Sequence, residues 1–156
     1  MAATTPTAFD PDCTHQGLVL TMTAGSDILS GQIVAFAATD DGCVDPATSS
    51  LSAPIGVAGN TAAAGEAVTV YSQGCVVKVE LAADNTTADQ GDWLSVSTVA
   101  GCAVVADTAI AAHDSQQAGL YPIGIAIEAI AAGASTVGGR GHCLINITPI
   151  WTGTTT

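Results

Sequence analysis

Apolar and polar residues alternate along short stretches of the chain, with the period of two that is typical of a β-strand with one buried face. The clearest alternation covers residues 77–81 and 145–148. Further strands are predicted by apolar, β-branched or aromatic runs at residues 18–22, 32–36, 68–71, 93–96 and 103–105. Turn signals recur about every 8 to 12 residues. The pattern predicts an all-β, mainly antiparallel fold, a compact barrel or sandwich.

One block of the chain is repeated. Residues 53–81 align without a gap to residues 121–149, and the identical pairs include Pro54/Pro122, Gly56/Gly124 and Cys75/Cys143. The match extends upstream at lower quality, so the duplication covers about 31–81 and 91–149. A repeat of this length indicates two copies of one supersecondary unit within a single β domain at 18–150. The glycines at its strongest matches are predicted to be structural turns: Gly56, Gly65, Gly124 and Gly133.

Three segments fall outside the strand pattern. Residues 107–117 lack alternation and begin with a suitable N-cap, so they predict at most one short helix, or else a surface loop. Residues 1–17 are polar and punctuated by proline, which predicts an extended N-terminal arm, and residues 151–156 predict a flexible tail. Both ends could simply fray. They could also add backbone to a neighbouring sheet edge. In that case the candidate contact residues are Thr5, Pro6, Phe9, Pro11 and Trp151, with Phe9 and Trp151 as anchors.

The charge composition bears on the choice of partner. Only 10% of the residues are charged, and the net charge of −12 arises because there are just two basic residues, Lys78 and Arg140. A chain without a basic patch cannot neutralise phosphates, so binding to nucleic acid or to an anionic membrane is not expected. No secretory signal and no apolar run of membrane-spanning length is found, which predicts synthesis in a cytoplasm.

The reactive residue types form no catalytic or metal-binding signature. The four cysteines of the repeat are expected to be buried apolar residues, with disulfides as the alternative, whereas Cys13 stands alone in the N-terminal segment; none has zinc spacing. Pairing of His142 with Cys75, or of His113 with Asp107 or Asp114, matches no known motif. Two acidic turns, at 40–45 and 84–89, lack the spacing of a calcium loop. We therefore expect no catalytic residue, no metal and no cofactor.

The layout of the repeat resembles a known family. Each unit has a Gly-Gln/Asp start, then Pro-Ile-Gly-Val/Ile-Ala, then Ala-Ala-Gly; the first closes with Gly-Cys-Val-Val-Lys-Val. This arrangement resembles the capsid decoration, or cement, proteins of tailed bacteriophages and related viruses. The resemblance implies a protein made in the host cytoplasm that sits on the exterior of the virion head. There it would bind the major capsid protein, commonly as a homotrimer, and clamp neighbouring subunits against internal DNA pressure.

Two other functions remain open from the residues. A carbohydrate-binding or adhesive surface module needs exposed aromatic rings, and these are scarce: Phe36 and Trp93 both look like core residues. A self-assembling shell subunit is the other alternative, and it would form extended arrays alone. The residues therefore favour capsid decoration.

Overall fold

The computed structural model describes residues 13–15, 17–48, 53–82, 87–106, 121–131 and 139–147. Every regular element in this part of the chain is a β-strand, and all but one of the strand pairs are antiparallel. The predicted all-β, mainly antiparallel fold is therefore confirmed. The short helix predicted within 107–117 lies outside the described residues.

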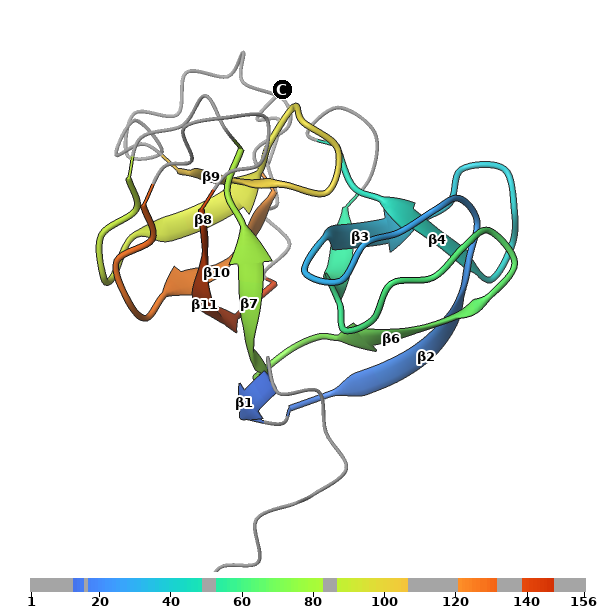
Figure 1. Ribbon diagram of the computed structural model, residues 1–156, viewed down its shortest axis with the longest axis horizontal. Coiled ribbons are helices and arrows are strands. Elements are labelled where there is room, and N and C mark those ends of the chain that lie inside the picture. Colours follow the sequence, from blue (N-terminus) through green and yellow to red (C-terminus); the bar gives the residue numbers. More distant parts are fainter. Residues whose placement is uncertain are drawn as a thin grey trace, which may run out of the picture.

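The strands form two groups that lie side by side (Figure 1). The first group is a closed barrel with the order β2-β4-β3-β5-β6. The second is a six-stranded sheet with the order β1-β7-β11-β10-β8-β9. The barrel strands are β2 (Val19–Ala24), β3 (Ile33–Phe36), β4 (Cys43–Pro46), β5 (Pro54–Ala58) and β6 (Ala67–Tyr71). The sheet strands are β1 (Cys13–His15), β7 (Val76–Glu80), β8 (Trp93–Val96), β9 (Ala103–Val105), β10 (Pro122–Ala126) and β11 (Arg140–Ile145).

Leaving β1 aside, the two groups have the same topology. In the barrel, β2 runs parallel to β4, and every other neighbouring pair is antiparallel. In the sheet, a parallel bridge between Leu81 and Ala103 brings the end of β7 to β9, and the remaining pairs are antiparallel. The strands β2 to β6 thus correspond in order to β7 to β11.

This correspondence differs from the gapless sequence alignment at one strand. The alignment matches β7 with β11, whereas the topology makes β6 the counterpart of β11 and β7 the counterpart of β2. The reason is that the connection from β10 to β11 is longer than the one from β5 to β6. Cys75 and Cys143 are therefore not equivalent. Cys43 and Cys102 are equivalent, since the carbonyl of each accepts the same backbone hydrogen bond across its hairpin.

The division of the chain into arm, domain and tail stays a prediction.

Two apolar cores hold the groups together. One fills the barrel and consists of Ala24, Ile28, Val34, Val44, Ala58, Ala62, Val68 and Val70. The larger one fills the sheet side and includes Val77, Val79, Leu81, Leu94, Val96, Ile123, Ile130 and Ile145. Ile33, Val57 and Tyr71 belong to this second core although they come from barrel strands. The outer wall of the barrel therefore supplies part of the core of the sheet, which makes the two groups one cooperative unit.

Gly56 and Gly124 are not turn residues, which corrects their predicted role. Each is the third residue of its strand, β5 or β10, next to a register shift in the pairing with β3 or β8. A Cβ atom at Gly56 would overlap the carbonyl oxygen of Tyr71, and one at Gly124 would overlap that of Leu144. The requirement is close approach of a neighbouring backbone. Gly65 does lie in a turn, with φ at 84°, and Gly133 lies outside the described residues.

Candidate functional site

The predicted contact residues fall beyond the part of the chain that the structure describes. Thr5, Pro6, Phe9, Pro11 and Trp151 all lie outside it. The last part of the predicted arm is described, as strand β1. Cys13 pairs with Val77 and His15 pairs with Val76, both on β7 of the same chain. This part of the arm therefore extends the chain's own sheet.

The two ends of the described domain lie close together, beside the turn that joins β6 to β7. Strand β1 pairs with the beginning of β7, and Figure 1 shows them adjacent. At the other end of the chain, the Gly74 N–H donates to the Ile145 carbonyl at 2.9 Å. The Ile147 N–H donates to Gln73 Oε1 at 3.0 Å, and Gln73 Nε2 donates to Asn146 Oδ1 at 2.7 Å. Strand β1 and Ile147, at the two ends of the described residues, thus both lie beside this turn.

Two aromatic side chains predicted to be in the core are at the surface. Phe36 is 56% exposed at the end of β3, and Trp93 is 41% exposed at the start of β8. The prediction was wrong because alternation identifies a strand but not which apolar residues lie at its open ends. Exposed aromatic rings commonly take part in protein contacts.

The polar groups on the outer face of β7 and β11 form local pairs. Arg140 donates to Glu80 Oε2 at 3.1 Å and to the Ser30 carbonyl at 3.1 Å, which links the sheet to a loop of the barrel. His142 Nδ1 lies 2.8 Å from Glu128 Oε1, and the His142 N–H donates to the same oxygen. This backbone hydrogen bond is the main reason that the pKa of the Glu128 carboxyl lies below its ordinary value.

The Cys–His pair considered from the sequence does not form. Cys75 Sγ accepts from the Gly17 N–H at 3.2 Å and lies 3.5 Å from the Leu18 carbonyl, while His142 faces Glu128. The alternative with His113 lies outside the described residues. Of the five cysteines, Cys43, Cys75, Cys102 and Cys143 are thiols in the structure. The expectation that they are apolar packing residues holds for the last three of these, which are buried.

The buried thiols should resist alkylation. Burial raises the pKa of Cys143 to about 12, so at pH 8 this thiol stays protonated and is not nucleophilic. Cys43 is only partly buried. We expect iodoacetamide at pH 8 to modify Cys43 faster than Cys75, Cys102 or Cys143 in the folded protein, by at least about tenfold. Peptide mass spectrometry would measure the rates, with urea-unfolded protein as the control in which all four react alike. Equal rates in the folded protein would contradict the described burial.

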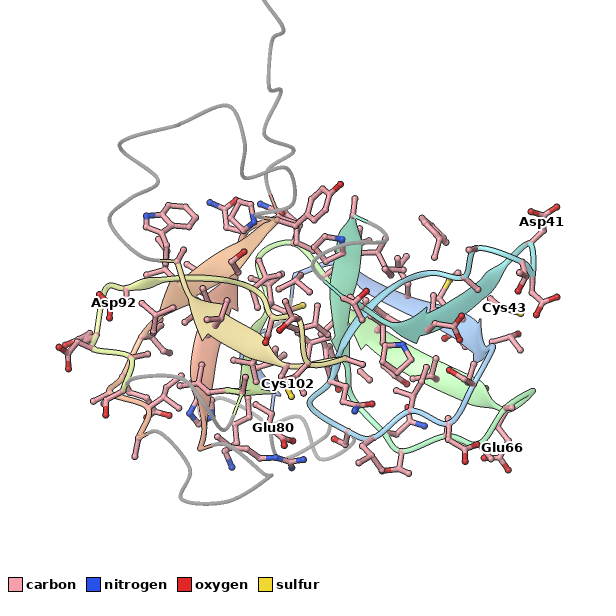
Figure 2. All side chains as sticks on the ribbon, turned by 90° about the horizontal axis from the view of Figure 1, so that it is seen from above. Asp41, Cys43, Glu66, Glu80, Asp92 and Cys102 are labelled. Atoms are coloured by element: carbon pink, nitrogen blue, oxygen red, sulfur yellow. The ribbon has the colours of Figure 1, made fainter. Side chains whose placement is uncertain are left out.

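Among the described residues, no group of three or more His, Cys, Asp or Glu side chains is arranged to hold a metal ion. Asp41 stands at the tip of the β3–β4 hairpin, at one end of the molecule (Figure 2). Asp45 Oδ1 accepts from Ser26 Oγ at 2.7 Å. The second acidic turn, at 84–89, is only partly described.

The described residues contain no helix that is long and apolar enough to cross a membrane.

Comparison with known proteins identifies a family. The family model of the phage cement protein matches residues 13–141, which is most of the chain and includes both groups of strands. No curated protein matches the chain. The matched region begins at β1 and ends within β11. The chain therefore belongs to the phage cement protein family, and its role is that of a structural component that stabilises a phage capsid.

Proposed function

We propose that this protein binds the exterior of the icosahedral phage head as a homotrimer and clamps neighbouring copies of the major capsid protein against the pressure of packaged DNA. The observation that carries the proposal is the match to the phage cement protein across residues 13–141. Synthesis in the host cytoplasm and binding after the head has formed complete it.

The position of the chain ends supports the way in which the clamp would work. Strand β1 and Ile147 both lie beside the β6–β7 turn, which supports a clamp in which the arm and the tail reach the same neighbouring surface. Phe9 and Trp151 are the proposed anchors, with Thr5, Pro6 and Pro11 keeping the arm extended around Phe9. In a trimer, six such segments would act together, and each would raise the effective concentration of the others.

The charge of the chain suits a particle surface. A net charge of −12 with two basic residues gives decorated heads a strongly acidic coat. Such a coat keeps particles apart from one another and from anionic cell debris, because like charges repel at separations within the screening length. The capsid contact itself would then depend on apolar and backbone interactions, in keeping with the scarcity of lysine and arginine.

The number of copies in the particle tests this proposal. In virus particles banded on a density gradient, quantitative mass spectrometry should find this chain at a fixed simple ratio to the major capsid protein, as occupancy of the three-fold positions requires. Heads lacking the protein should lose DNA at a lower temperature, and adding the purified protein back should restore retention. A few copies per particle would point instead to a vertex or tail component, and unchanged DNA retention would contradict clamping.

A further inference from the structure

The outer face of the sheet carries a row of apolar side chains that crosses four strands. The register pairs Val76 with Leu144, Leu144 with Ile125, and Ile125 with Trp93, so these side chains are direct neighbours across β7, β11, β10 and β8. Trp93 is 41% and Leu144 37% exposed, and the other two are half-buried. We refer to these four residues as the outer row. A continuous exposed apolar strip is uncommon on a protein that works alone.

The barrel has the same row, and there it is covered. The register of β2, β6, β5 and β3 places Val19, Tyr71, Val57 and Ile33 side by side in the equivalent order. Tyr71, Val57 and Ile33 are buried in the core of the sheet, and Val19 packs against that core. In the first unit, therefore, this row is the surface on which the next unit of the chain packs.

The β8–β9 hairpin makes a backbone contact with the covered row. The Ile33 N–H donates to the Gly101 carbonyl at 2.8 Å, and the Gly101 N–H donates to the Ala47 carbonyl at 2.8 Å. Gly101 is buried there, and Val96, the last residue of β8, lies in the same core as Ile33. The hairpin end of the second unit thus rests against the outer wall of the first.

The equivalent hairpin of the barrel, between β3 and β4, is exposed. Gly42 has nearly the same φ as Gly101, 81° against 76°, but no atom lies within 4 Å of the position of a Cβ at Gly42. Phe36, the counterpart of Val96, is the most exposed of the described large apolar side chains, at 56%. Each chain therefore presents one uncovered hairpin end, on the barrel, and one uncovered row, on the sheet. The contact of the β8–β9 hairpin with the covered row shows how a hairpin end of this kind packs on such a row.

We propose that the outer row binds a second copy of this chain, which covers it with its β3–β4 hairpin and places Phe36 against Trp93. The contact is head to tail, so it must close into a ring to give a finite oligomer. Asp41, at the hairpin tip, and Asp92, next to Trp93, lie at opposite ends of the molecule (Figure 2). The inference rests on the proposed function for one point: we take the closed ring to be the trimer that is proposed to decorate the head.

The charges around the outer row are mixed: Lys78 and His142 lie on one side of it, while Asp92 adjoins Trp93 and Glu128 is paired with His142. The β3–β4 hairpin carries Asp40 and Asp41, with Asp45 on β4. Lys78, the only lysine of the chain, and His142 are paired in the register immediately beside the outer row. In the proposed contact an acidic hairpin that lies toward Lys78 and away from Asp92 would be favoured, so these charges would set the orientation of the contact more than its strength.

The oligomeric state of the full chain without capsid tests the inference. Sedimentation velocity and native mass spectrometry should find the wild type as a small closed oligomer at about 50 µM, a concentration at which a contact with a Kd of about 1 µM or tighter is almost fully formed. Phe36→Asp and Trp93→Asp should each weaken the contact by about 30-fold or more, as loss of a central aromatic contact does, and give monomers at low concentration. Leu29→Asp is the matched control, because Leu29 is 53% exposed but lies outside both surfaces.

Mixing the two variants gives the decisive result. A Phe36→Asp chain keeps an intact row and a Trp93→Asp chain keeps an intact hairpin, so an equal mixture should form a heterodimer that neither forms alone. Circular dichroism should show all variants folded, and Leu144→Glu provides a second substitution in the row. A wild-type monomer at about 50 µM, or variants with the wild-type oligomer, would overturn the inference, as would a mixture without heterodimer. If the wild-type protein forms the oligomer but does not bind capsids, that result would count against the proposed function and not against this contact.

Discussion

Replacing Gly124 by valine should reduce the free energy of unfolding by about 4 kcal/mol or more, a large share of the roughly 5–15 kcal/mol typical of a single domain. A Cβ at this position would overlap the Leu144 carbonyl oxygen and lie 2.8 Å from Cys143 Sγ. The first of these is backbone of the paired strand β11, which cannot move without breaking its pairing with β7. A register shift also adjoins Gly124, on the other side of β10 in its pairing with β8.

Urea unfolding monitored by circular dichroism would measure the loss. Gly42→Ala is the control, because it changes a glycine with φ at 81° where the side chain has open space. Its cost should be about 1 kcal/mol, from backbone conformation alone. Gly56→Val should behave like Gly124→Val, since a Cβ there overlaps the Tyr71 carbonyl oxygen. Similar small losses for Gly124→Val and Gly42→Ala would show that the strands are not as close as described.

The sequence predicted the fold class and most strands because alternation is a local property. The predicted strand at 77–81 corresponds to β7 and the one at 68–71 to β6, and both carry the expected burial of every second residue on one face. The predicted strand at 145–148 was placed too late, because β11 spans Arg140–Ile145. Its first half contains Gly141 and polar neighbours, and such a segment has no alternation to detect.

The pairing of strands was harder to predict than their existence. A gapless alignment cannot accommodate the longer connection between β10 and β11, so it matched the chemically similar runs of β7 and β11 instead. Only the hydrogen-bonded neighbours distinguish the possibilities: β6 and β11 each lie between the first and fourth strands of their group. Because β7 begins the second group, the turn at Gly74 joins two units instead of ending a hairpin within one.

The surface was predicted least well, for a physical reason. Phe36 and Trp93 are apolar residues in strands, and a local pattern assigns such residues to the core. Whether a strand end is covered depends on which unit packs against it, and this is a property of the whole fold. The available signal was the repeat itself: Trp93 is the counterpart of Ile33, so the same row occurs once covered and once exposed.

Removing residues 1–12 should weaken binding to capsids by about 100-fold or more while leaving the domain folded. This truncation stops short of β1, so the pairing of Cys13 with Val77 and of His15 with Val76 is retained. The free energy of unfolding should therefore change by less than about 1 kcal/mol. Binding should fall steeply because three arms would act together in the proposed trimer, so the loss of each contact is multiplied by the loss of avidity.

Titration of purified heads with labelled protein, followed by sedimentation, would measure this loss. The matched control replaces residues 1–12 by glycine and serine at the same length, which keeps the reach of the arm and removes Phe9. If Phe9 is the anchor, that control and Phe9→Ala should both bind poorly, whereas Thr5→Ala should bind nearly as wild type. Trp151→Ala should add to the loss, because Ile147 and strand β1, from which the tail and the arm continue, lie beside the same turn. Saturation of heads by the truncated chain at the wild-type concentration would show that the domain surface, not the arm, makes the capsid contact.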